Sequence, residues 1–119
     1  MDLLPRHKEA IIPIEKFTKY ALHPENSNGK HVAFYRALGY GINNADKLIE
    51  NIRSNLDKFP ADIRPDKGHG TRYCVEMILI GENGKIARVV TAWIDDRATG
   101  QIRLTSVYVK SRKGEGDDY

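Results

Sequence analysis

The hydrophobic period of the sequence changes once, and this change constrains the fold more than any other feature. Apolar residues recur at three- and four-residue spacing through residues 1–64, as in helices, and then alternate through residues 70–110, as in strands. Between them, "PADIRPDKGHG" (60–70) has the proline and glycine content typical of a connection. A run of helices followed by a run of strands predicts an α+β fold, with about three helices packed on one face of an antiparallel sheet of three to four strands.

Three segments of the first half carry helical signals. The first begins at Pro13 and places three apolar residues on one face: Ile14, Phe17 and Ala21. The second, "KHVAFYRALGYG", stops at Gly39, a favourable residue for a helix C-terminus. The third, "NNADKLIENIRSNLDKFP", can be capped by Asn43 or Asn44, and its apolar face is formed by Leu48, Ile49, Ile52, Leu56 and Phe59.

The second half predicts three strands in two hairpins. The segments "TRYCVEMILI", "KIARVVTAWI" and "QIRLTSVYV" are joined by "GENG", which contains the hairpin signal Asn83-Gly84, and by "DDRATG". Alternation along the last strand predicts one face with Arg103, Thr105, Val107 and Val109, and the opposite face with Ile102, Leu104, Ser106 and Tyr108. One sheet face must meet the helices, so the other should show arginines, hydroxyl groups and an aromatic ring.

Charge is unevenly distributed within what the chain length predicts to be a single domain (1–110) with a polar C-terminal tail (111–119). The net charge is only +3, but residues 84–113 carry seven Lys or Arg against two acids, Asp95 and Asp96. A basic sheet attracts phosphates and acidic proteins. The alternative is an ordinary solvated face of lysines and arginines.

Several classes of protein are disfavoured by what the sequence lacks. Cys74 is the single cysteine, so an internal disulfide and a multi-cysteine metal site are excluded. The four histidines are scattered, and no nucleotide-binding glycine motif or zinc-protease motif occurs, so we expect no metal and no cofactor. No apolar run approaches the roughly 20 residues of a membrane span, and the N-terminus lacks a signal-peptide core, so we expect no stable membrane association.

The polar residues that remain match the needs of metal-free RNA cleavage. The 2′-hydroxyl is an internal nucleophile, so a protein must supply only a base, an acid, cations for the developing charge and groups that position the phosphate. We expect His31 and His69 to act as base and acid, and Lys30, Arg72 and Arg103 to stabilise the charge. Phosphate positioning is expected from Thr71, Thr105 and Tyr108. Each of these residues alone also fits a purely structural role.

The order of short motifs resembles a known family. "ALHPEN", Lys30 with Phe34 and "LGY", "GENG", Thr91-x-Trp93, and Leu104-Thr105-x-x-Tyr108 occur in sequence across residues 10–110. This pattern resembles the C-terminal toxin domain of polymorphic, filamentous-haemagglutinin-like proteins of contact-dependent growth inhibition, in a family of uncharacterised function. The layout of helices followed by a sheet is also similar to the barnase, EndoU, colicin E5/D and RelE superfamily of ribonucleases.

The resemblance implies both a site and a biological setting. It directs attention to Lys30, Thr91, Thr105 and Tyr108, whereas His69 departs from the family pattern; Trp93 is a further candidate for substrate contact, with a core position as its alternative. Such toxin domains pass from the surface of the producing bacterium into the cytoplasm of a target cell. They are neutralised by a cognate immunity protein, which the basic sheet predicts to be acidic.

The leading hypothesis is therefore a toxin that cleaves RNA, either transfer RNA or another RNA, by 2′-hydroxyl attack without a metal ion. Two alternatives stay open at this point. One is a non-enzymatic module that binds nucleic acid or protein, and the other is a toxin nuclease that acts on DNA.

Overall fold

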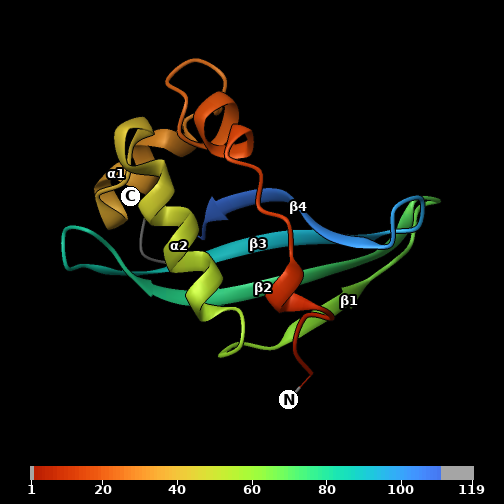
Figure 1. The fold of residues 1–119 in the computed structure, drawn as a ribbon. Helices are drawn as coiled ribbons and strands as arrows, with labels where there is room; N and C mark the ends of the chain where they lie inside the picture. The colour runs from red at the N-terminus through yellow and green to blue at the C-terminus, as the bar shows by residue number, and fades with distance from the viewer. Residues whose placement is uncertain (1, 111–119) are drawn as a thin grey trace.

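The computed structural model describes residues 2–110, and its centre is one antiparallel sheet (Figure 1). The strands lie in their sequence order, β1 (Ala61–Arg64), β2 (Gly70–Ile80), β3 (Ile86–Asp96) and β4 (Gln101–Val109). β2 and β3 form the long predicted hairpin, paired from Gly70 opposite Asp96 to Ile80 opposite Ile86. The predicted tail (111–119) lies outside the described residues.

Helical segments pack on one side of this sheet. They are the π-helix η2 (Phe17–Ala21), α1 (Lys30–Leu38) and α2 (Ala45–Asn55), with short 3-10 turns at His7–Glu9 and Ile42–Asn44. α1 contacts β3 and β4, whereas α2 contacts β2. One continuous core joins them, including Phe17, Phe34, Leu48, Met77 and Trp93. The predicted α+β fold, with helices against an antiparallel sheet, is therefore confirmed.

The helix ends follow the sequence signals in part. Gly39 ends α1 with a φ of 77°, as expected of a glycine at this position. Asn44 precedes α2, but its side chain does not cap that helix. The side chain instead accepts a hydrogen bond from Gly41 N and donates one to Gly39 O, at 2.7 and 3.1 Å. Asn44 therefore closes the turn between the two helices.

The connection predicted at 60–70 contains a strand, and this part of the prediction is wrong. Between Pro60 and Pro65, β1 pairs with β2 so that Asp62 lies opposite Cys74 and Arg64 opposite Arg72. Only four residues separate two prolines, so propensity alone gives a weak strand signal, and pairing with β2 stabilises the extended chain. Gly68 and Gly70, at φ values of 111° and 142°, let the chain reverse into β2.

A β-bulge in β4 corrects the predicted faces of that strand. Ala92 lies opposite Ser106 but its neighbour Trp93 lies opposite Leu104, so Thr105 is an extra residue in β4. The extra residue shifts the alternation by one position. Leu104 and Val107 therefore both face the helices, although strict alternation would place them on opposite faces.

Candidate functional site

The face of the sheet away from the helices, called here the outer face, carries a row of three arginines. Because residues that pair across strands share a face, the register aligns Arg64, Arg72, Ile94 and Arg103 across β1, β2, β3 and β4. We call Arg64, Arg72 and Arg103 the arginine row. Within residues 2–110, none of the three forms an ion pair.

The pairing of Arg64 with Arg72 opposes stability. Like charges directly opposite each other on neighbouring strands repel, at a cost of a few tenths to about 1 kcal/mol. Three other arginines of the described chain have carboxylate partners: Arg6 contacts Asp95, Arg88 contacts Glu76 and Arg97 contacts Asp66. Arg36 and Arg53 have no ion pair within residues 2–110, but they do not lie opposite another arginine on a neighbouring strand. An uncompensated pair of cations on an open face is therefore suited to binding an external anion.

A hollow of about 380 Å³ lies beside the arginine row. Its position follows from side-chain size, because the next row of the outer face places Cys74 and Ala92 between larger neighbours. We call it the central hollow; it is lined by Arg64, Arg72, Tyr73, Cys74, Val90, Ala92, Trp93, Ile94, Thr105 and Tyr108. Arg64 and Arg72 line the hollow from β1 and β2, and Thr105 and Tyr108 line it from β4.

Lys30 brings a further cation to this β4 side. Its Nζ lies 5.8 Å from the centroid of the Tyr108 ring, within the range of a cation–π contact. Lys30 is the first residue of α1, where the helix dipole disfavours positive charge. It also has no carboxylate partner among the residues that the structure describes. The Tyr108 ring, rather than an ion pair, therefore orients this ammonium group.

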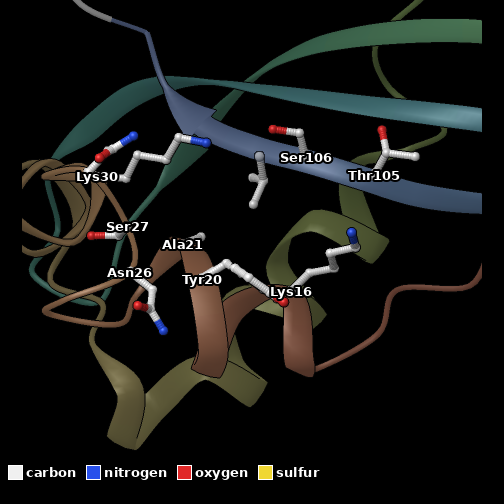
Figure 2. A pocket seen from close by; sticks show the side chains of 10 residues that line it. Lys16, Tyr20, Ala21, Asn26, Ser27, Lys30, Thr105 and Ser106 are labelled. Carbon is white, nitrogen blue, oxygen red and sulfur yellow. The ribbon is translucent and has the colours of Figure 1, made fainter.

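A second depression, of about 250 Å³, lies at the free edge of β4, between that strand and the segment that contains η2 (Figure 2). We call it the edge groove; it is lined by Lys16, Tyr20, Ala21, Asn26, Ser27, Asn28, Lys30, Thr105, Ser106 and Val107. Lys16 Nζ lies 5.9 Å from the Tyr20 ring centroid, so this lysine too is held by an aromatic ring. Thr105 lines both the edge groove and the central hollow.

His31 borders the edge groove through Ser27. Its Nδ1 lies 2.7 Å from Ser27 Oγ, and the same oxygen accepts the His31 backbone N–H at 3.2 Å. Ser27 is only 3% exposed, so this contact is held firmly. Because Ser27 Oγ already accepts one hydrogen bond, it can donate its own proton to Nδ1, which leaves Nε2 as the protonated nitrogen of a neutral ring.

The structure does not bring His69 to the same place. His69 immediately precedes Gly70, whereas Lys30, the neighbour of His31 in α1, lies near Tyr108, in the row of Glu76 and Val90. Six residues of β2 separate these rows, which is about 20 Å along an extended strand. His69 is exposed and lines a small depression with Asp96 and Arg97. The two predicted proton-transfer residues are therefore about 20 Å apart along the strands.

Three other predicted site residues also lie away from the central hollow or beneath it. Thr71 shares the helix-side face of β2 with Val75 and lies opposite Asp95. Thr91 is fully buried, and its hydroxyl donates to Val75 O at 2.9 Å while accepting the Trp93 indole N–H at 2.8 Å. The Trp93 side chain is 1% exposed and belongs to the core.

In the Tyr108 row and the row beyond it, an ion cluster on the outer face ties β2 and β3 to Lys110, the residue after β4. Glu76 of β2 accepts hydrogen bonds from Lys110 at 2.9 Å and from Arg88 of β3 at 3.1 Å. The hydrogen bond from Lys110, with that from Arg88, holds the pKa of the Glu76 carboxyl below its ordinary value despite partial burial, which acts the other way. These two cations share one carboxylate, whereas the arginine row has no ion pair within residues 2–110.

Sequence reasoning missed Arg64 and Lys16. Arg64 carried one available signal, the alternation of Ala61, Asp62, Ile63 and Arg64 between two prolines. Lys16 carried none, because nothing local distinguishes it from the other lysines of its helix.

Among residues 2–110 no group of three His, Cys, Asp or Glu side chains could hold a metal ion. No helix of this part of the chain is long and apolar enough to span a bilayer.

These features define a small α+β protein in which helices cover one sheet face and the other is open and cationic. Residues 3–111 match the family described as Domain of unknown function (DUF6883), and the chain belongs to that family. Neither the curated proteins nor the solved structures contain a match to it. The family carries no assigned function, so the resemblance to toxin domains stays a prediction.

Proposed function

We propose that this protein binds RNA on its outer face and cleaves it without a metal ion. The observation that carries the proposal is the arrangement around the central hollow. The arginine row lies on one side, and Lys30, Tyr108 and Thr105 lie on the other. A phosphodiester bound between them would contact cations from two directions, and its ribose would lie beside hydroxyl groups of β4.

The chemistry needs no group from outside the chain. The ribose 2′-oxygen attacks the neighbouring phosphorus and loses its proton to a base, the bond from phosphorus to the 5′-oxygen breaks, and that oxygen takes a proton from an acid. The products are a 2′,3′-cyclic phosphate and a 5′-hydroxyl end. Lys30 and Arg72 stabilise the additional negative charge. Thr105, whose hydroxyl donates to Ala92 O at 3.1 Å, redirects this proton to the phosphate when RNA binds. His31 and Tyr108, on the β4 side, are the proposed proton-transfer groups.

The test is incubation of the purified protein with total RNA in EDTA, followed by analysis of the new ends. We expect cyclic phosphate and 5′-hydroxyl products. Arg72→Ala should lower kcat/KM at least about tenfold, the loss typical of one hydrogen bond to a charged group. Arg36→Ala removes an exposed arginine of α1 that lines neither depression, and it should leave the rate unchanged. Intact RNA at high protein concentration would count decisively against cleavage.

A second candidate function is a non-enzymatic module that binds nucleic acid. The separation of His31 from His69 favours it, because the histidine pair expected for acid–base chemistry is not assembled. This module would lose RNA affinity on Arg72→Glu but would leave bound RNA intact. A nuclease acting on DNA is a third possibility, and a requirement for a divalent metal would identify it.

In its biological setting, we propose that the protein is a bacterial toxin domain held inactive by an immunity protein. The basis is the motif resemblance, and the open cationic face supports an acidic partner. Expression of the domain should arrest bacterial growth, and Arg72→Glu should relieve the arrest. Entry from the surface of a producing cell into the cytoplasm of a target cell belongs to the same proposal.

A further inference from the structure

The central hollow and the edge groove meet at β4. Thr105 lines both, and Lys30 lines the groove while its ammonium group lies over Tyr108, which lines the hollow. The N-terminal chain covers the edge of β4 only at its beginning, where Ile11 N donates to Ile102 O and Leu104 N donates to Ile11 O. Among residues 2–110, no backbone hydrogen bond covers this edge from the bulge onward, so a chain-like ligand can pass from one depression into the other.

The edge groove offers backbone as well as side-chain groups. Lys110 N donates to Arg88 O, and hydrogen-bonded pairs alternate along antiparallel strands, so Ser106 and Tyr108 direct their backbone groups toward β3. Val107, between them, directs its N–H and C=O away from β3 and toward the groove that it lines. The groove therefore combines a backbone donor and acceptor with the Lys16 ammonium group and the Asn26 amide.

The Tyr20 side chain adds an exposed aromatic ring to the hydrogen-bonding groups of the edge groove. Tyr20 lines the groove, and its side chain is 55% exposed. An accessible aromatic face beside hydrogen-bonding groups is the arrangement by which proteins hold unpaired nucleobases. A volume of about 250 Å³ is below the range of about 300–1,000 Å³ for sites that hold drug-sized ligands. The groove therefore fits one nucleobase with its phosphate, and it cannot admit a duplex.

We infer that the substrate is single-stranded RNA that crosses the β4 edge at Thr105, with its phosphate in the central hollow and the next base in the edge groove. This inference rests on the proposed function and adds a base subsite formed by Lys16, Tyr20 and the Val107 backbone. A duplex keeps its bases stacked inside the helix, so it cannot use the subsite.

The test uses 2′-O-methyl oligoribonucleotides, which lack the attacking hydroxyl, and measures their affinities by fluorescence anisotropy. A single-stranded hexamer should bind at least about tenfold more tightly than a hairpin duplex. Lys16→Ala and Tyr20→Ala should each weaken hexamer binding about five- to 150-fold, the range for one stacked base. Binding of an abasic dinucleotide, which has the phosphate but no base to enter the groove, should stay within about twofold. Lys19→Ala and Tyr35→Ala are matched controls, because both residues are exposed and line neither depression.

Cys74 separates failure of this inference from failure of the proposed function. It is the single cysteine and lines the central hollow, so bound RNA should slow its alkylation. If neither the dinucleotide nor the hexamer slows alkylation or binds, the proposed function and the inference are both wrong. If both RNAs protect Cys74, the proposed function stands, and two outcomes would overturn the inference alone. One is that the duplex binds as tightly as the hexamer, and the other is that Lys16→Ala and Tyr20→Ala bind the hexamer normally.

Discussion

Thr91 is a polar residue in the middle of the core, and its hydroxyl oxygen serves two partners. It donates to Val75 O and accepts the Trp93 indole N–H, so three polar groups are satisfied without water. Buried polar groups that lose such partners are costly. The geometry therefore gives Thr91 and Trp93 a structural role, and it explains why a threonine is tolerated on the helix-side face of β3.

Thr91→Val should destabilise the protein by about 1–3 kcal/mol, because the shape is kept while Val75 O and the indole N–H lose their partner. Urea unfolding followed by Trp93 fluorescence measures this change. Thr18→Val is the control, since the Thr18 hydroxyl bonds Ile14 O at an exposed position where water can replace it. RNA affinity of folded Thr91→Val should equal that of the wild type; a selective loss of affinity would restore Thr91 to the site.

At the level of the elements, the outer face holds two sets of cations, one paired with a carboxylate and one without an ion pair among residues 2–110. Arg88 and Lys110 share Glu76 and fasten β2, β3 and the end of β4 to one another. The arginine row at the other side of the hollow has no such acid among residues 2–110. Strand pairing brings both sets onto one face. Cations of the same residue type can therefore either stabilise the sheet through an ion pair or stay available to an external anion.

The Glu76 cluster should add a small, pH-dependent increment of stability. Its depressed folded-state pKa means that the increment is complete above about pH 4.5, the ordinary value for glutamate, and is lost as pH falls through the folded-state pKa. Since the groups are about one-third or more exposed, the increment should be under about 1 kcal/mol and should weaken in salt. Thermal unfolding of Glu76→Gln between pH 3 and pH 7 measures it. Glu50→Gln, an exposed change on α2, should follow the wild-type curve, and an identical curve for Glu76→Gln would contradict the prediction.

At the scale of the whole molecule, the length of the sheet separates the predicted histidines. His31 is placed beside the edge groove by Ser27, whereas His69 lies at the turn before β2, about 20 Å along the strands. A base and an acid that act on one phosphate must both lie within hydrogen-bond reach of it. His69 therefore cannot act on the same phosphate as His31, which lines neither depression and borders the edge groove through Ser27.

The separation predicts that the two histidines act independently. In the cleavage assay, the effects of His31→Ala and His69→Ala on kcat/KM should add in the double variant to within about 0.5 kcal/mol. His31→Ala should also change the pH profile of the rate, while His69→Ala should leave that profile as in the wild type. Strong non-additivity, with each single change as damaging as both, would show that the histidines work as a pair.

The candidate site was predictable from sequence only in part, and particular residues show why. Arg72, Thr105 and Tyr108 were identified by residue type and line the central hollow, and Arg103 lies in the arginine row beside it. Lys30 was identified in the same way; it lines the edge groove, with its ammonium group over the Tyr108 ring. Arg64 and Lys16 were missed because they enter the site through strand pairing and through the path of the η2 segment. Neither effect is visible in a local window.

The sequence by itself determined the α+β class, the β2–β3 hairpin and the helical segments, because these depend on side-chain period and turn residues that act over a few positions. Only the tertiary structure decided the pairing of β1, the shift of face at Thr105, the arginine row and the distance between His31 and His69. Those features depend on register between segments far apart in the chain. A single extra residue in one strand reverses every face beyond it, so no local pattern can specify them.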